Sequence, residues 1–486
     1  MSDDGDPRAP TLADQLAQFG APRFTPYDEE KGAGLEVRYE PSYSRVIPDG
    51  EYAAPSAAAT HEYGVLFRAD HETFADGMCR QARAHASVLA QQVPLLLASI
   101  NGKVRRPVFD EDGTQIGVQT FSLAGDDMLE DEVFEEVGQL RRTSIRNYLA
   151  VMYHTVIRSA EQLRSLVLPE YTRAAIGAAD RLLARTVIYT PWERSTVSPE
   201  IIEAVMQVGQ MWLQCSRNVD AFVSAGLPKE KVRLIPPAFD PSGPVAQIPK
   251  TRTKVPSGKR FYNIGKWEPR KAQHELLGAF LMAFSPGDAA SLTMKVSYFG
   301  EWDGYPSHRE TLGVWLSDRA VRARGWTPEN VARQVAIYDK QFTDGQMTKL
   351  HELHNIYVSA SHAEGWDYPA FDAKTAGNRL VHVGFGGSED YCDVTDVRVP
   401  FSLGPVDPQY GWEPDAQWAD YRREDLVRAL STVTPRQGVE TVTDFAAHYG
   451  APVIGRQMFD ALRHLILGAE PALWDTASAS WRQHAD

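Results

Sequence analysis

Two acidic residues eight positions apart, Glu364 and Asp372, lie where a strand pattern gives way to a helical pattern. The helical pattern begins near Pro369, and proline is favourable at a first helical position because its missing N–H would be unpaired there. Free N–H groups at such a helix start receive phosphate or sugar oxygens. We therefore interpret Glu364 as an acceptor of hydrogen bonds from sugar hydroxyls, and Asp372 as an acceptor from a ribose diol. Spacing alone leaves a second interpretation open, in which Glu364 is a surface charge and Asp372 only complements the helix dipole.

A cluster of basic residues surrounds a second transition from strand to helix. Between positions 250 and 271 there are eight basic residues and one acidic residue, Glu268, in a chain of net charge -14. The basic residues are Lys250, Arg252, Lys254, Lys259, Arg260, Lys266, Arg270 and Lys271. Such an excess indicates an anionic partner, and a nucleotide diphosphate fits because Lys and Arg neutralise a leaving pyrophosphate. We select Lys266 and Lys271, which flank the strand end and the helix start after Gly265, whereas the first three basic residues fit a solvated linker.

Two alternations of strand and helix patterns position these residues, one over 64–235 and one over 260–383. Between them, positions 241–259 hold six prolines and glycines, which no helix or central strand tolerates. The pattern predicts an α/β chain with two mainly parallel, doubly wound sheets, whose carboxyl edges bind ligands. The predicted division is an extended or partly disordered segment 1–60, an N-terminal domain 61–240, a linker 241–259, a C-terminal domain 260–440 and a helical tail 441–486.

Composition narrows the class of protein. The 486 residues suit two domains, and 43% hydrophobic with 23% charged residues is typical of a soluble globular chain. No apolar run approaches the roughly 20 residues of a membrane span, and the acidic N-terminus is not a secretory signal. The acidic balance argues against bulk nucleic acid as a partner. The three cysteines (Cys79, Cys215, Cys392) are isolated and fit no disulfide framework, so we expect reduced thiols and a cytoplasmic protein. The histidine spacings match no metal site.

Four segments resemble one enzyme family in that family's order. They are YTPWERSTVSPE, CSRNVDAFVSAGLPKEKVRLIPPAFD, IGKWEPRKAQHELLGAF and EGWDYPAFDAKTAG, within positions 183 to about 400. Together they resemble the retaining family-4-type glycosyltransferases (glycosyl transferases group 1). The resemblance implies the GT-B fold, with two Rossmann-like domains facing a cleft. It also implies transfer from a nucleotide-diphosphate sugar, held by the C-terminal domain, with retention of configuration and without a metal or other cofactor.

The resemblance also implies roles for individual residues. Lys266 and Lys271, after Gly265, would hold the diphosphate, and Asp372 would bind ribose. Glu364 and the backbone of Gly365, Trp366 and Asp367 would hold the sugar. His154, at a predicted strand end, would face the cleft, which makes His154, Glu364 and Lys271 the candidate catalytic residues. A buried structural histidine is the alternative for His154.

The acceptor side departs from the family. The place of its usual Gly-rich loop holds FRADHETFADGMCRQA, so Asp70, His71 or Gly77 would substitute for it, and the second acid of the family's motif is Asp372 instead of Glu. Trp192 and Glu193 are expected near the domain junction, where Glu193 either orients an acceptor hydroxyl or is a hinge charge. The acceptor stays open among protein, glycan, lipid-linked sugar and small molecule. A GT-B-fold sugar-nucleotide epimerase and a degenerate, non-catalytic module that binds a sugar or a partner are the alternative functions.

Overall fold

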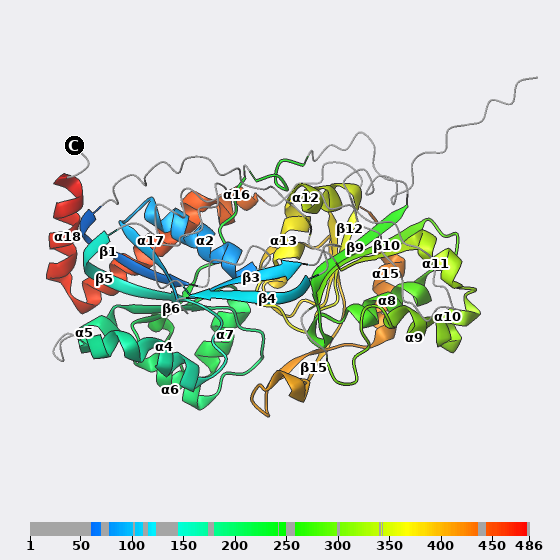
Figure 1. Ribbon diagram of the computed structural model, residues 1–486, viewed down its shortest axis with the longest axis horizontal. Helices are drawn as coiled ribbons and strands as arrows, with labels where there is room; N and C mark the ends of the chain where they lie inside the picture. The colour runs from blue at the N-terminus through cyan, green and yellow to red at the C-terminus, as the bar shows by residue number, and fades with distance from the viewer. Residues whose placement is uncertain are drawn as a thin grey trace, which may run out of the picture.

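The computed structural model describes residues 60–69, 77–100, 103–109, 115–122, 144–173, 179–241, 243–248, 258–298, 302–339, 342, 344–435 and 444–483. Residues 1–59 of the predicted N-terminal segment 1–60, most of the C-terminal part of the predicted linker, and the candidate residues Asp70 and His71 lie outside these ranges. The described chain forms two six-stranded parallel sheets that lie side by side, each with helices packed on it (Figure 1). The predicted α/β class with two doubly wound parallel sheets is confirmed.

The first sheet has the strand order β2-β1-β5-β6-β7-β8. Its strands are β1 (Thr60–Ala69), β2 (Leu95–Ser99), β5 (Ser144–His154), β6 (Thr186–Thr190), β7 (Gln210–Leu213) and β8 (Val232–Leu234). Its helices are α2 (Gly77–Ala90), α4 (Ala160–Arg173), α5 (Ala179–Ala184), α6 (Pro199–Met206) and α7 (Ser216–Ser224). Strands β6 and β7 are buried along their whole length, as expected for parallel strands covered on both faces.

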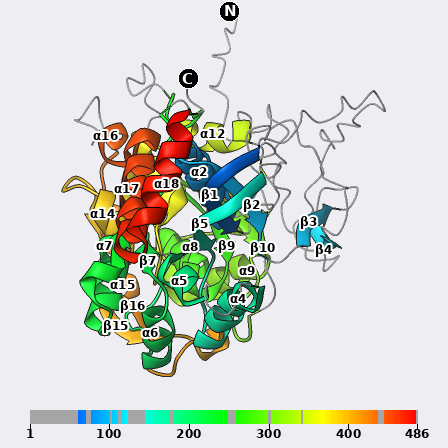
Figure 2. The ribbon, with the colours of Figure 1, turned by 90° about the vertical axis from the view of Figure 1, so that its left-hand side faces the viewer.

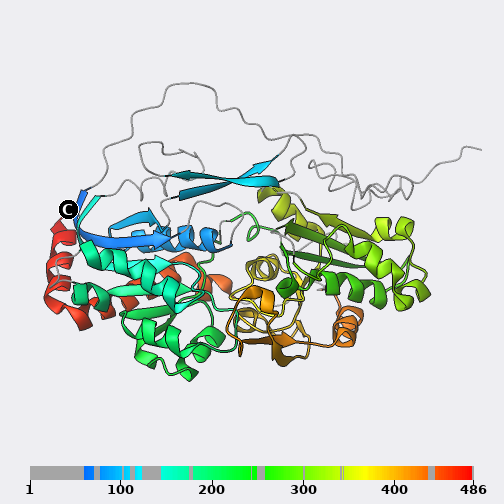
Figure 3. The ribbon, with the colours of Figure 1, turned by 60° about the horizontal axis from the view of Figure 1, so that its bottom comes forward.

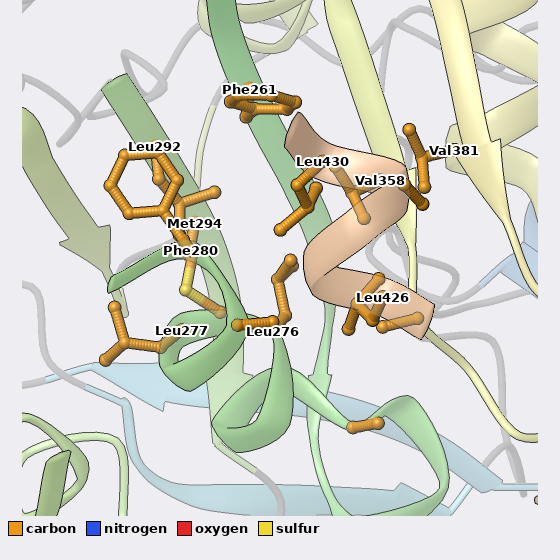
Figure 4. Close-up of a cluster of buried hydrophobic side chains, with 14 of the residues drawn as sticks. Phe261, Leu276, Leu277, Phe280, Leu292, Met294, Val358, Val381, Leu426 and Leu430 are labelled. Atoms are coloured by element: carbon orange, nitrogen blue, oxygen red, sulfur yellow. The ribbon is translucent and has the colours of Figure 1, made fainter. Parts of the chain in front are cut away.

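The second sheet has the order β11-β10-β9-β12-β13-β14. Its strands are β9 (Lys259–Trp267), β10 (Ala290–Tyr298), β11 (Val335–Tyr338), β12 (Ile356–Ser359), β13 (Arg379–His382) and β14 (Val397–Arg398). Its helices are α8 (Gln273–Ala283), α9 (Thr311–Ser317), α10 (Arg319–Ala323), α11 (Pro328–Gln334), α12 (Asp344–Leu353), α13 (Tyr368–Thr375), α14 (Ser388–Tyr391) and α15 (Arg423–Thr432). Helices α8 and α15 pack on one face of this sheet. Leu276 of α8 faces Leu426 and Leu430 of α15, and Phe280 of α8 lies beside Met294 of β10 in the same buried cluster (Figure 4).

The end of the chain returns to the first sheet. Helices α16 (Phe445–Tyr449), α17 (Ala451–Ala469) and α18 (Pro471–Gln483) follow the second sheet in sequence. The apolar face of α17, with Ile454, Met458 and Leu462, belongs to the same buried cluster as Val65 of β1 and Leu149 of β5. Figure 2 shows α17 and α18 beside the strands of the first sheet. The tail therefore joins the core of the N-terminal half.

Two antiparallel pairs lie outside the parallel sheets. Strands β3 (Lys103–Phe109) and β4 (Gln115–Ser122) form a hairpin that the strand patterns did not predict, and Figure 3 shows it as a separate layer. Strands β15 (Ser402–Pro405) and β16 (Gln417–Asp420) form the second pair, with the 3₁₀ turn η4 (Pro408–Tyr410) between them.

Candidate functional site

The site lies where two adjacent parallel strands end. Strand β9 leads into the 3₁₀ turn η3 (Pro269–Lys271) and then α8, with Ala272 in a left-handed conformation (φ 51°) between them. Strand β12 leads through the loop 360–367 into α13. Because β9 and β12 are paired in parallel, both connections emerge at the same carboxyl edge, where ligands of α/β folds bind.

Glu364, in the loop after β12, is the buried centre of this site. Its Oε1 forms an ion pair with Lys271 Nζ and accepts a hydrogen bond from Ser361 Oγ, and its Oε2 lies 3.4 Å from Arg270 Nη1. Burial acts to raise the pKa of Glu364, but the charges of Lys271 and Arg270 outweigh it and hold that pKa below its usual range. Glu364 is therefore ionised and held between two cations.

Arg270 connects the two halves of the chain. Its guanidinium lies 2.7 Å from Glu268 and 3.0 Å from Glu193, which follows β6 of the first sheet, and donates to the Ala363 carbonyl at 2.7 Å. Burial acts to lower the pKa of Arg270, but the carboxylates of Glu193, Glu268 and Glu364 raise it well above its ordinary value. Burial raises the pKa of Glu193. The site thus gathers two cations and three carboxylates from both halves.

Gly365 lies at a close contact between the two halves. A Cβ at this position would lie 2.6 Å from Pro191 Cβ and 2.9 Å from Gln214 Oε1, both in the N-terminal half. Any other residue here would push the loop and the first sheet apart. Gly265 is also close-packed, since a Cβ there would lie 3.0 Å from Gln273 Nε2 and 3.7 Å from Lys271 Cδ.

Asp367 caps the helix that follows Glu364. It adopts a left-handed conformation (φ 67°), its Oδ1 accepts from the Ala370 N–H at 3.4 Å, and its Oδ2 accepts from Ser359 Oγ. Burial, assisted by the nearby charge of Glu364, raises the pKa of Asp367 to about 6. The preceding residue, Trp366, turns its ring into a buried aromatic cluster beside Tyr391, and its carbonyl accepts from the Tyr391 hydroxyl at 3.1 Å.

The remaining donor-side candidates are Asp372 and Lys266. Asp372, in α13, forms a two-point contact with Arg80 of α2, from Nη1 to Oδ2 at 2.7 Å and from Nη2 to Oδ1 at 3.3 Å. Lys266 is half-buried in β9, opposite Ser297 of β10. The second cation at Glu364 is Arg270, which the sequence analysis counted but did not select; its position directly before Lys271 was the available signal.

His154, the histidine selected at the end of β5, is buried in the N-terminal half. Its ring stacks on Tyr189 (4.3 Å between centroids, 10°) and lies edge-on to His85 at 5.5 Å. Neither ring nitrogen has a hydrogen-bond partner among the described residues, and burial, with His85 adding to it, lowers the pKa of His154 well below its ordinary value. Burial also lowers the pKa of His85 to about 4, although its Nε2 lies 3.0 Å from the Pro236 carbonyl. The sequence patterns did not single out His85 as a neighbour of His154.

The other acceptor-side candidates have different surroundings. Gly77 begins α2, and a Cβ there would lie 2.8 Å from the Tyr368 ring. Trp192 is buried, its Nε1 donates to the Thr196 carbonyl at 3.0 Å, and the guanidinium of Arg194 lies 4.0 Å from its ring centroid. Among the described residues, no group of three or more His, Cys, Asp or Glu has an arrangement suited to a metal ion. No helix within the described ranges combines the length and apolar character that crossing a membrane requires.

Comparison with known proteins gives weak similarities. No protein-family model and no curated protein matches the chain. Among solved structures, it is similar to HepE of Anabaena in complex with UDP (13% identity, 86% of this chain and 100% of that chain, TM-score 0.44). It is also similar to the trehalose-6-phosphate synthase OtsA (12%, 85% and 98%, 0.46) and to the pneumococcal O-GlcNAc transferase GtfA in complex with UDP and GlcNAc (11%, 65% and 57%, 0.43). Likenesses at these scores assign no activity to this chain.

Proposed function

We propose that the chain is a glycosyltransferase that moves a sugar from a nucleotide-diphosphate sugar to an acceptor hydroxyl, with retention of configuration and without a bound metal. One observation carries the proposal: Glu364 is buried between Lys271 and Arg270 at the shared carboxyl edge of β9 and β12. A buried carboxylate beside two cations offers acceptors for sugar hydroxyls and positive charge for a diphosphate.

The charge balance supports exchange of partners when the donor binds. Lys271 and Arg270 meet three carboxylates, Glu193, Glu268 and Glu364, in the unliganded site. A diphosphate would take over contacts with the two cations, and Glu364 would then be available to the sugar. As the bond from the anomeric carbon to the diphosphate oxygen breaks, the electron pair stays on that oxygen, the acceptor oxygen forms the new bond to the anomeric carbon, and the proton of the acceptor hydroxyl passes to the departing diphosphate. Lys271 and Arg270 stabilise the charge that develops there.

A non-catalytic binding module is the second candidate, and the pairing of the charged groups favours it. Asp372 already has a partner in Arg80, and Arg270 contacts three carboxylates and a carbonyl. A module whose charges are permanently matched in this way would bind no diphosphate. The transferase and the non-catalytic module therefore differ in nucleotide affinity. The epimerase, the remaining alternative, differs from the transferase because it forms no glycosylated acceptor.

The test is calorimetric titration with UDP, GDP and ADP in the presence of EDTA. We expect one of them to bind, and Lys271→Met to weaken it by about ten- to a hundredfold, because a charge-assisted contact of about 1.5–3 kcal/mol is lost. Lys349→Met is the matched control, because it removes an ion pair to Glu352 on α12 of the same half. Equal affinity of the Lys271 variant and the wild type would overturn the donor-site assignment, and a wild type that binds none of the three would favour the non-catalytic module.

A further inference from the structure

The first turn of α2, in the N-terminal half, lies directly against the first turn of α13, in the C-terminal half. Gly77 leaves room for the Tyr368 ring, which a Cβ would approach to 2.8 Å. The Tyr368 hydroxyl donates to Gln81 Oε1, which also accepts from Gln214 Nε2 at 2.7 Å. These contacts fix the position of α2, and hence of Arg80, relative to α13.

Arg80 uses this position to reach Asp372. The two Arg80 nitrogens contact the two different oxygens of the Asp372 carboxylate, at 2.7 and 3.3 Å, which is the two-point geometry that orients a carboxylate plane. The Arg80 side chain is 59% exposed and that of Asp372 17%. An exposed pair of this kind contributes at most about 1 kcal/mol to stability. The pair is therefore too weak to hold the two halves together, which leaves orientation as its effect.

We infer that Arg80 is a positioning residue of the donor site, supplied by the N-terminal half, which orients Asp372 to recognise the 2′- and 3′-hydroxyls of the donor ribose. This inference rests on the proposed function and on the role of ribose ligand that the sequence analysis predicts for Asp372. It assigns to α2 a part in donor recognition that neither the motif spacing nor the acceptor-side candidates predict.

The hydrogen-bonding capacity of the carboxylate permits both partners at once. Each oxygen of an ionised Asp has two lone pairs, and Arg80 occupies one on each oxygen. The other pair of sites can accept from the two neighbouring hydroxyls of a ribose. Asp is one methylene shorter than Glu, so its carboxylate reaches less far toward the ribose. Arg80 compensates for this by fixing the carboxylate plane, which reduces the orientational freedom that is lost on binding.

The test compares nucleoside diphosphates with and without the diol. Of UDP, GDP and ADP, the one that binds best is titrated against its 2′,3′-dideoxy analogue, in the wild type and in Arg80→Met. We expect the wild type to prefer the diol by about tenfold or more, and the preference to fall by about threefold or more in Arg80→Met, because the weakened contacts are hydrogen bonds to a charged group. Asp372→Asn should lose most of the preference, and adding Arg80→Met to it should change little further, as expected for residues that act as one unit.

Arg217→Met is the matched control. It removes another ion pair between the two halves, 2.7 Å from Arg217 Nη2 to Glu389, that does not touch Asp372. This variant should keep the wild-type preference for the diol. If Arg80→Met still binds the nucleotide and keeps the wild-type preference for the diol, the role of Arg80 is overturned and the proposed function is not. If the wild type binds none of the three diphosphates, the proposed function and this inference fall together.

Discussion

At the scale of residues, two buried carboxylates of the site, Glu364 and Asp367, differ in whether neighbouring cations offset the cost of burying their negative charge. Glu364 is kept ionised by Lys271 and Arg270, whereas Asp367, three residues later, has no cation in direct contact among the described residues. Its partners are the Ser359 hydroxyl and the Ala370 N–H. The ionised form of Asp367 is therefore destabilised by burial and by the negative charge of Glu364, which the two cations of η3 keep ionised.

This difference predicts a pH-dependent gain in stability for Asp367→Asn. The pKa of Asp367 is raised from 3.8 to about 6 in the folded chain, so its stabilising contribution is present below pH 4 and is lost as pH rises through 6. Asparagine is neutral, caps helices well and tolerates the left-handed conformation. We expect the free energy of unfolding at pH 8 to rise by about 1–3 kcal/mol in the variant, and the gain to vanish near pH 4. Urea unfolding at a series of pH values measures both.

Asp444→Asn provides the control for this prediction. Asp444 also caps a helix, α16, by accepting from the Ala447 N–H at 3.0 Å, but its side chain is exposed. The same change of residue there should alter stability by less than about 0.5 kcal/mol at any of these pH values. A gain at Asp367 that is equally large at pH 4 and pH 8 would contradict the electrostatic explanation.

At the scale of elements, the loop that carries Glu364 is shaped by the backbone of a neighbouring loop. The Glu364 N–H donates to the Phe385 carbonyl at 3.0 Å, and Glu364 and Gly386 form an isolated parallel bridge. Gly386 has a φ of +135°, and a Cβ there would lie 1.8 Å from the Glu364 carbonyl oxygen. The position of Glu364 therefore depends on a glycine in the loop after β13.

Gly386→Ala should both destabilise the fold and weaken nucleotide binding. The new Cβ must displace the Glu364 backbone, and the φ is one that alanine rarely adopts, so we expect a loss of about 2–4 kcal/mol in unfolding free energy. Gly304→Ala is the matched control, because Gly304 also has a positive φ (+70°) but no atom within 4 Å of its ideal Cβ. That variant should lose about 1 kcal/mol and keep its nucleotide affinity. Equal losses in the two variants would show that the clash with Glu364 is unimportant.

The patterns of strands and helices predict the sheets and the location of Glu364 and Lys271, because both residues follow buried strands whose apolar runs are unambiguous. They do not predict the partners of Arg270, since Glu193 is 77 positions away and in the other half. Nor do they predict that Asp372 meets Arg80, because helix periodicity says which face is polar but not what lies opposite. Contacts between the halves depend on packing that no local pattern specifies.

At the scale of the whole molecule, the chain links its halves by several routes. Arg194 forms an ion pair with Glu413, its guanidinium lies 4.0 Å from the ring of Trp192 and 5.1 Å from that of Trp412, and the Ser195 N–H donates to the Gln417 carbonyl at 3.0 Å. The polypeptide itself crosses again after α15, so that α16 lies between the halves and α17 packs on the first sheet (Figure 1). The buried cluster on the first sheet is therefore completed only when α17 and α18 have been added.

Met458→Ala tests this dependence of the N-terminal half on the tail. The Met458 side chain is fully buried among residues of β1, β5 and α2, so its truncation should reduce the free energy of unfolding by about 2–5 kcal/mol. Gln457→Ala, at an exposed position of the same helix, should change it by less than about 0.5 kcal/mol. Hydrogen exchange locates the loss: protection should fall in β1 and β5 more than in β12 and β13, because α17 belongs to the same buried cluster as β1 and β5. Equal loss of protection in both sheets would mean that the halves unfold as one unit, whereas loss confined to α17 and α18 would mean that the first sheet is stable without the tail.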